Sequence, residues 1–383
     1  MQIGHWITRR QRILPIGLDI GHHAVKMVQL AIRDDGVRVV AAGRETVDLS
    51  DVCDEDSWRQ QVAPAIRRLL AAGDFKGRDV VSALPAGRLR ITSLRLAETE
   101  AGDVDKALRK EAAHRFALDP RTDSVHYVSA GSVRQGDEVK NEYILFASDD
   151  ETIRRHIAQL EGVGLRLVGI DAAPCALFRN FERVMRRQED KERTIMLLDV
   201  GHRYTTVVLG RTGEMCFVKQ MAFGAARFDE RVAEKLSVSI EDARVLRRRM
   251  PSDETVDPTT RRLVADALHG TAEQLAAEIA LCLRYYTVTF RGKRVERAIV
   301  AGAGVYEPAL LNVLRHHLAV EADVAEPLRG FDLGLVGSKI EDFGPAADFA
   351  LAVGLTLKGW GASTTALVKS DVGLESILEG APS

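Results

Sequence analysis

The chain contains an internal repeat, which limits the folds that it can adopt. The segments Gly17–Ala24 (GLDIGHHA) and Leu197–Tyr204 (LLDVGHRY) align without a gap at an offset of 180 residues. Each segment places an aspartate within an apolar run and follows it with glycine and histidine. Because a buried lone carboxylate is costly unless something pairs it, its recurrence predicts two related halves that use it in equivalent places.

Strand and helix patterns follow each copy of the repeat, which indicates an α/β protein. Trp58, Val62 and Ile66 recur at helical spacing after Ser57, which we expect to be the N-cap of that helix. The apolar runs expected to form strands of the main body are 16–20, 25–32, 37–42, 79–84, 165–170, 194–200, 204–209, 214–220 and 297–301. The segments with helical spacing are 57–72, 176–186, 225–236, 240–249, 260–286, 308–317 and 348–358.

Residues 88–164 have a different order of elements, which predicts a small α/β domain inserted in the first half. Either Asp149 or Asp150 should cap its second helix. The charged run Arg186–Arg193 (RRQEDKER) is typical of an exposed connector. The expected divisions are an N-terminal tail at 1–12, a first half at 13–87, 165–190 and 346–358, the insert at 88–164, a second half at 191–345 with a helical insert at about 230–292, and a C-terminal tail at 359–383.

Composition argues against several classes of function. The 53 basic and 55 acidic residues leave a net charge of −2, which argues against nucleic acid as a partner. The basic run Arg247–Arg249 is interpreted as a solvated helix face. The 4 cysteines stand far apart and predict neither a zinc site nor a disulfide scaffold, as expected of a cytoplasmic chain with reduced thiols. No apolar stretch approaches the roughly 20 residues that span a bilayer.

The repeated Asp-x-Gly turns have the chemistry of a phosphate site. Glycine lets the backbone approach a ligand, and amides at such turns can point at phosphate oxygens. Asp19 and Asp199 would then hold a hydrated Mg²⁺ beside a nucleotide, since Mg²⁺ keeps several waters and prefers oxygen ligands. Alternatively, each aspartate only accepts hydrogen bonds from the amides of its own turn.

Two further glycine-containing turns support the phosphate interpretation. The run Ile299–Gly304 (IVAGAG) ends a strand before the helix at Pro308, and its small residues leave the backbone open to adenine or ribose. Gly224 lies in a similar strand-to-helix turn. The chain has neither a P-loop motif nor a GxGxxG that opens a helix after the first strand, so P-loop and Rossmann sites are not predicted.

These motifs, in this order, resemble the PilM family of type IV pilus assembly, in the FtsA/PilM branch of the actin-like ATPase superfamily. The resemblance covers about residues 13–358. It implies an actin-like α/β fold, in which duplicated RNase H-like halves surround a nucleotide cleft and the small insert at 88–164 belongs to the first half. The matching segments are GLDIGHHAVKMVQL, VVSALPAGRLRITSLRL, KALRKEAAHRFALDP, LEGVGLRLVGIDAAPCAL, LLDVGHRYTTVVL, KQMAFGAARFDERV and IVAGAGVYEPALLNVL.

The resemblance implies ATP or ADP with Mg²⁺ as cofactor, in a scaffold that is at most a slow ATPase. The implied Mg²⁺ ligands, through water, are Asp19 and Asp199. His22, His23 and His202 depart from the family, which usually has small residues at these positions. The implied nucleotide-binding residues are Asp19, Gly21, His22, His23, Lys26, Asp199, Gly201, Thr205, Thr206, Gly224, Gly302, Ala303 and Gly304.

The resemblance also implies a protein partner. PilM-like proteins hold a short N-terminal segment of PilN, a bitopic membrane protein, near the first half and its insert. In this chain the groove is expected around Val80–Leu84 and Arg88–Leu96. The implied location is cytoplasmic and peripheral to the inner membrane, with the membrane contacted only through partners. Self-association into a ring or another homo-oligomer is a further expectation, and nucleic acid is not an expected partner.

Two other functions stay open. A small-molecule kinase of the same superfamily would use Asp171 as a base toward a substrate hydroxyl, although a structural role for this aspartate is also expected. In a nucleotide-free relative the histidines would fill the cleft, whereas protonated histidines could instead donate to phosphate. The adjacent pairs His22-His23 and His316-His317 should lie on the surface or in loops, and neither pair is expected to chelate a metal.

Overall fold

The computed structural model describes residues 11–49, 54–97, 104–119, 121–135, 138–183, 185, 193–250, 255–290, 294–336 and 346–360. Most of the predicted tails at 1–12 and 359–383, and all but the last residue of the predicted connector at 186–193, lie outside these ranges. In the part of the chain that the structure describes, no helix combines the length and apolar character that crossing a bilayer requires.

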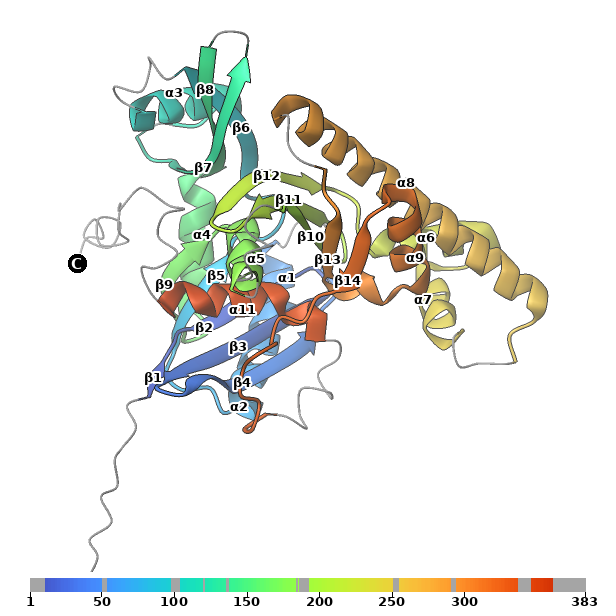
Figure 1. Ribbon diagram of the computed structural model, residues 1–383. Helices are drawn as coiled ribbons and strands as arrows, with labels where there is room; N and C mark the ends of the chain where they lie inside the picture. The colour runs from blue at the N-terminus through green and yellow to red at the C-terminus, as the bar shows by residue number, and fades with distance from the viewer. Residues whose placement is uncertain are drawn as a thin grey trace, which may run out of the picture.

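The first half is built on a six-stranded sheet, whose first strands are drawn in blue in Figure 1. β2 (Ile16–Ile20) forms an antiparallel hairpin with β3 (Ala24–Arg33) and runs parallel to β5 (Asp79–Ala83). β9 (Arg166–Asp171) lies parallel to β5 on its other side. The remaining strands, both antiparallel to β3, are β1 (Arg12–Ile13) and β4 (Gly36–Thr46).

The second half repeats this arrangement in a five-stranded sheet. Its order, β12-β11-β10-β13-β14, matches β4-β3-β2-β5-β9 strand for strand. Asp19 pairs across the first hairpin with Lys26, and Asp199 pairs across the second with Thr206, so the two copies share one register. The duplicated α/β fold expected from the repeat is therefore confirmed. The strands are β10 (Ile195–Val200), β11 (Thr205–Arg211), β12 (Glu214–Met221), β13 (Arg297–Ala301) and β14 (Glu321–Val324).

The first expected helix begins earlier than predicted and is irregular. Its N-cap is Asp54 and not Ser57, because the Asp54 carboxylate accepts a 2.7 Å hydrogen bond from the Ser57 amide. A π-helical turn, η1 (Trp58–Val62), separates α1 (Glu55–Ser57) from α2 (Ala63–Ala72). The other helices of the main body are α5 (Ala173–Glu182), α6 (Ala226–Leu236), α7 (Ile240–Arg249), α8 (Pro258–Phe290), α9 (Pro308–Leu318) and α11 (Ala350–Thr356), with the short 3₁₀ turns η4 (Ala303–Tyr306), η5 (Ala346–Phe349) and η6 (Leu357–Trp360).

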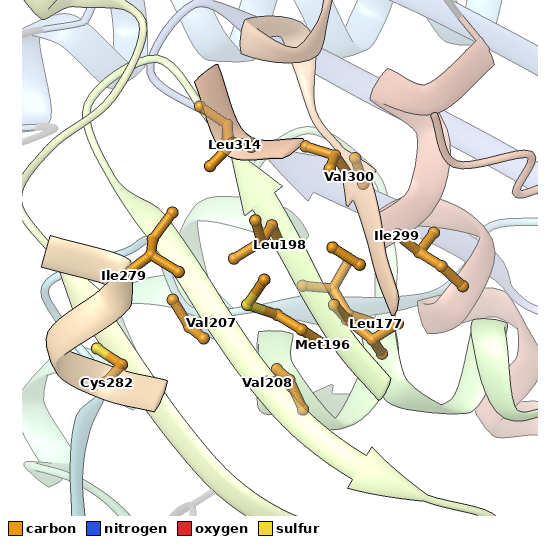
Figure 2. Packing of buried hydrophobic residues seen from close by; sticks show 14 of the residues in the cluster. Leu177, Met196, Leu198, Val207, Val208, Ile279, Cys282, Ile299, Val300 and Leu314 are labelled. Atoms are coloured by element: carbon orange, nitrogen blue, oxygen red, sulfur yellow. The ribbon is translucent and has the colours of Figure 1, made fainter. Parts of the chain in front are cut away.

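The largest hydrophobic core surrounds the sheet of the second half. β10 is a nearly continuous apolar run that is buried along almost its whole length, as expected of a strand covered on both faces. Figure 2 shows its Met196 and Leu198 among side chains from several elements. Leu177 comes from α5, Ile279 from α8 and Leu314 from α9, so three helices seal this sheet.

A separate three-stranded sheet, at the top of Figure 1, lies within the segment predicted as an insert. Its helix α3 (Val104–Phe116) packs Leu108 against Leu145 in a small core of its own. α4 (Asp150–Glu161) is capped by Asp149, and its Leu160 packs instead into the first-half core. The last helix of the predicted insert therefore joins the main body. The strands, in spatial order, are β6 (Arg90–Ala97), β8 (Glu138–Ser148) and β7 (Ser124–Gln135).

Candidate functional site

The two repeated hairpins end in the same tight turn. The Gly21 amide donates to the Ala24 carbonyl at 3.0 Å, and the Gly201 amide donates to the Tyr204 carbonyl at 3.0 Å. A Cβ on either glycine would lie about 3 Å from that carbonyl oxygen, so the turn favours glycine. Because these two amides are used inside the turns, they are not the ones free to meet a phosphate.

The carboxylate of Asp19 is paired by a lysine from the neighbouring strand. Asp19 Oδ2 lies 2.7 Å from Lys26 Nζ, which also lies 3.0 Å from Asp348 Oδ1. Arg44 Nε contacts the other oxygen of Asp348 at 3.1 Å. Burial raises the pKa of Asp19, against the opposing effect of Lys26. Burial would lower the pKa of Lys26, but the two carboxylates raise it well above its usual range, so the ammonium stays charged.

The second aspartate has a different environment. Thr206 occupies the position that corresponds to Lys26, and no ion pair joins Asp199 to another side chain among the described residues. Burial, together with the carboxylates of Asp19 and Asp348, raises the pKa of Asp199 to about 7, even though Lys26 opposes the rise. The negative charge of Asp199 is therefore the least compensated in this cleft, and a cation bound next to it would be stabilised most.

The histidines of the two turns meet across the cleft. His23 stacks on His202 with ring centroids 4.9 Å apart and planes at 28°, and His22 lies beside Tyr204 at 5.5 Å. Burial and the nearby Arg248 lower the pKa of His23, and burial beside His23 lowers the pKa of His202 to about 3. His22 and His23 lie in a loop, as expected, but they are half-buried between the halves and not on the open surface.

Two cavities adjoin at the stacked histidines. A small one of about 110 Å³ lies between the hairpins, and a large one of about 1020 Å³ lies among α6, α7, α8 and the start of α9. Arginines dominate the polar lining of the large cavity, so it suits an anionic ligand. The residues that line both cavities are His23, Arg44, His202, Ala303 and Asp348. The arginines of the large cavity are Arg44, Arg244, Arg247, Arg248 and Arg261.

The interpretation of Arg247–Arg249 as a solvated face is wrong for Arg247, which is partly buried, whereas Arg248 and Arg249 are exposed as expected. Arg247 Nε lies 2.9 Å from the buried Asp229, and its Nη1 lies 3.1 Å from Glu307. Arg248 Nη2 lies 3.2 Å from His23 Nε2. The sequence offers no signal for these contacts, because the partners come from distant parts of the chain.

The structure brings most of the predicted site residues to the cleft. Two of them do not line either cavity: the Thr205 hydroxyl donates to the Phe223 carbonyl at 2.7 Å, and Gly224 packs tightly against the His202 backbone. Gly304 lines only the large cavity. The residues that line the small cavity are Asp19, Gly21, His22, His23, Lys26, Asp199, Gly201, Thr206, Gly302 and Ala303. Their role in binding nucleotide stays a prediction.

Asp171 is placed as a structural residue. Its carboxylate lies 2.7 Å from Arg179 Nη1 and 3.5 Å from Lys358 Nζ. Burial would raise the pKa of Asp171, but Arg179 and Lys358 hold it below its usual range. The side chain lines neither cavity. A carboxylate that is already paired and held ionised in this way is a poor base, which weakens the kinase alternative.

The predicted peptide groove divides into a buried and an accessible part. β5 lies between β2 and β9, and its residues from Val80 to Ala83 are buried, so this strand offers no free edge. β6 pairs only with β8 among the described strands, and most of its side chains are partly exposed. Of the two predicted segments, only the one in β6 therefore lies at a sheet edge among the described strands, and peptide binding there stays a prediction.

Comparison with known proteins agrees with this architecture. Among solved structures, a PilM-PilN type IV pilus biogenesis complex is similar with a TM-score of 0.75 and 21% identity, over 92% of this chain and 100% of that chain. The ethanolamine utilization protein EutJ from Carboxydothermus hydrogenoformans is similar with a TM-score of 0.51 and 14% identity, over 90% of this chain and 89% of that chain. The fold is actin-like, as the resemblance implied.

The family itself is shown by a match along most of the chain. The family model described as type IV pilus assembly protein PilM covers residues 17–360. This range includes both hairpins, the three-stranded sheet and both cavities. The chain therefore belongs to the PilM family of type IV pilus assembly proteins.

Proposed function

We propose that this protein is a nucleotide-binding scaffold of a type IV pilus assembly complex, which binds a short N-terminal segment of a PilN-like membrane protein. The observation that carries the proposal is the duplicated hairpin pair, whose turns face one cleft beside a cavity of about 1020 Å³. A cavity of this volume is at the upper end of the range for small-molecule sites.

The charges of the cleft fit a nucleotide with a divalent cation. Lys26 is held charged at the base of the small cavity, and Arg44 and Arg248 line the large one. Asp199 would hold the cation through water, which suits a carboxylate with a raised pKa that forms no ion pair among the described residues. Bound Mg²⁺ would neutralise phosphate charge next to these side chains, and binding would set the relative angle of the two halves.

The accessible edge of β6 is the best candidate for the partner segment. An extended peptide can add to such an edge through main-chain hydrogen bonds, with side-chain pockets providing specificity. The similar solved structure is named as a complex of PilM with PilN, which supports a PilN-like partner. Through such a partner the protein would be peripheral to the inner membrane.

Calorimetric titration with Mg-ATP and Mg-ADP tests the nucleotide half of the proposal. Wild-type protein should bind both nucleotides, and Asp199→Asn should bind at least tenfold more weakly with Mg²⁺ but equally well in EDTA. The matched control is Asp323→Asn, on the exposed side of β14, which should bind like wild type. Absence of heat in every variant would instead favour a cleft closed by the stacked His23 and His202.

Hydrogen–deuterium exchange tests the partner half. A synthetic N-terminal segment of a PilN-like protein should bind saturably and slow exchange of the amides in β6. Exchange in α9, which lies beside α8 on the right of Figure 1, should not change. Saturable binding with protection elsewhere and none in β6 would refute the β6 edge, and absence of binding would refute the partner.

A further inference from the structure

We propose that His23, Asp48 and His202 form a site for a divalent transition metal of the zinc class, which joins the two halves at the junction of the two cavities. Each residue offers one ligand atom, and these atoms all lie within 4.8 Å of one another. His23 and Asp48 belong to the first half and His202 to the second, so a bound metal would connect the halves directly.

The ligand set indicates which metal fits. Two imidazoles and one carboxylate, with a fourth position left for water, are typical of zinc and its neighbours in the transition series. Mg²⁺ prefers an all-oxygen environment, so this site is chemically distinct from the pair Asp19 and Asp199. With metal–ligand bonds of about 2.0–2.1 Å, tetrahedral ligand atoms lie about 3.3 Å apart, so side-chain rotations must close the present spacing.

The backbone around Asp48 is fixed close to the first hairpin turn. The amides of Val47 and Leu49 donate to the carbonyls of His23 and His22 at 3.0 and 2.9 Å. The Gln61 side chain accepts from the Asp48 amide at 2.7 Å and donates to its carbonyl at 2.8 Å. These bonds leave the exposed Asp48 carboxylate free to turn toward the histidines.

The backbone of His202 is equally well fixed. Its carbonyl accepts from the Ala226 amide at 2.8 Å, and the Gly201 carbonyl accepts from the Ala225 amide at 2.9 Å. Gly224 packs so tightly against the His202 backbone that a Cβ there would lie 2.5 Å from the carbonyl oxygen. A site whose ligands sit on ordered turns loses little conformational freedom when a metal binds.

His23 carries an unused ligand atom. Its Nδ1 is buried without a hydrogen-bond partner in the part of the chain that the structure describes, which is a costly arrangement. Because Arg248 donates to Nε2, the neutral ring carries its proton on Nδ1, so metal binding at Nδ1 would move this proton to Nε2 and Arg248 away from the ring. Arg248, which contacts His23 Nε2, opposes a bound cation, so the affinity should be weaker than that of a four-ligand structural zinc site.

Titration of EDTA-treated, full-length protein with Zn²⁺ against a chromophoric chelator tests the site. We expect one Zn²⁺ per chain, and at least tenfold weaker binding in His23→Ala, His202→Ala and Asp48→Asn. His316→Ala is the matched control, because this histidine lies exposed on α9 and lines neither cavity, and the variant should leave binding unchanged. The proposal would be overturned if wild type did not bind Zn²⁺ stoichiometrically. It would also be overturned if His23→Ala and His202→Ala bound Zn²⁺ as tightly as wild type.

Two further readouts separate a metal site from a merely structural role for the rings. Co²⁺ bound by wild type should show the visible absorption of a tetrahedral site, and His202→Ala should lack it. Zn²⁺ should raise the melting temperature of wild type but not of His202→Ala, because a ligand that binds only the native state stabilises it. Absence of both signals in wild type would overturn the site even if the variants proved unstable.

Metal binding would also regulate the cleft, an extension that rests on the proposed function. His23 and His202 line both cavities, so a metal that holds them together would narrow the passage that a nucleotide needs. Zn²⁺ should therefore weaken Mg-ATP binding by wild type and leave His202→Ala unaffected. Zinc binding without this competition would refute the regulation and keep the site. Zinc binding by a protein that binds no nucleotide would refute the proposed function alone.

Discussion

Lys26 compensates the negative charge of two buried carboxylates in the cleft. Its ammonium contacts Asp19 within the same hairpin and Asp348 in η5, 322 residues away along the chain. Asp348 has a second cationic partner in Arg44, whereas Asp19 forms an ion pair with Lys26 alone among the described residues. Removal of one partner of a buried ion pair leaves the other charge uncompensated.

Replacement of Lys26 by methionine should lower the free energy of unfolding by about 3 kcal/mol at pH 7, measured by denaturant titration. The loss should shrink as the pH falls, because Asp19 without its lysine has a raised native pKa and then gains stability by taking up a proton. Lys140→Met is the control, since its contact with Glu138 is longer and more exposed, and it should cost less than about 1 kcal/mol. Equal losses in the two variants would contradict this role of Lys26.

The sequence predicts the cleft residues that lie within the repeat and misses those that come from elsewhere. Asp19 and Asp199 are recognisable because the motif and its partner strand are local in sequence. Asp348 and Asp48 stand in no motif, and only tertiary packing brings them to Lys26 and His23. Neither hydrophobic periodicity nor motif spacing contains that information, so the ion-pair network and the histidine cluster need the structure.

The helix α4 places a polar residue, His156, at a core position. Ile153, His156 and Leu160 are its buried residues, and Leu160 packs into the first-half core. The apolar spacing of Ile153, Ile157 and Leu160 predicts the helix correctly, but it gives no hint that His156 is buried on the same face. Burial lowers the pKa of His156 to about 4, and its Nε2 has no hydrogen-bond partner among the described residues.

His156→Leu should make the protein less sensitive to acid. In the native state the pKa of His156 is about 4, below the value of about 6.5 in the unfolded chain. The stability that the buried neutral ring contributes is therefore fully present above pH about 6.5 and is lost as the pH falls toward 4, because the unfolded chain takes up a proton first. Between pH 7 and pH 5 wild type should therefore lose about 2 kcal/mol of unfolding free energy that the variant keeps. Denaturant titrations at the two pH values measure the difference.

His269→Leu is the control for this comparison, because that histidine is exposed on α8 and its ion pair, among the described residues, is with Glu273 on the same helix. It should lose as much stability as wild type over the same pH range. If His156→Leu also did so, the acid sensitivity would have to come from other groups.

Element boundaries were harder to predict than element types, for a local physical reason. Asp54 and Ser57 are both good N-caps, and the choice of Asp54 adds a turn that the apolar spacing does not require. The π-helical turn that follows rotates Trp58 and Val62 into the first-half core. Packing against the sheet therefore overrides the regular period of the helix.

The helices α5 and α11 lie side by side between the two sheets and connect the two halves (Figure 1). α11 contributes to both cores: Ala350 belongs to the second-half core, and Val353 belongs to a first-half core. Two glycines allow the close approach of these elements. A Cβ on Gly354 would lie 2.0 Å from the Ala176 carbonyl oxygen of α5, and one on Gly17 would lie 2.0 Å from the Ala352 carbonyl oxygen.

Gly354→Ala should therefore weaken the junction of the two halves. Because the added methyl group has backbone in its way, α5 and α11 must move apart, at a cost of about 2–3 kcal/mol in unfolding free energy. Gly270→Ala is the matched control, since a Cβ on this glycine of α8 meets nothing within 4 Å. That variant should gain up to about 1 kcal/mol from the higher helix propensity of alanine.

Denaturant unfolding followed by circular dichroism, with hydrogen exchange of each half, measures both variants. If α5 and α11 join the halves, Gly354→Ala should raise the exchange of core amides in both sheets, whereas damage confined to one half would raise it in one sheet only. If Gly354→Ala instead gained as much unfolding free energy as Gly270→Ala, α5 and α11 would be able to move apart without loss of stability. The two halves would then depend for their association on the hairpin contacts at the cleft.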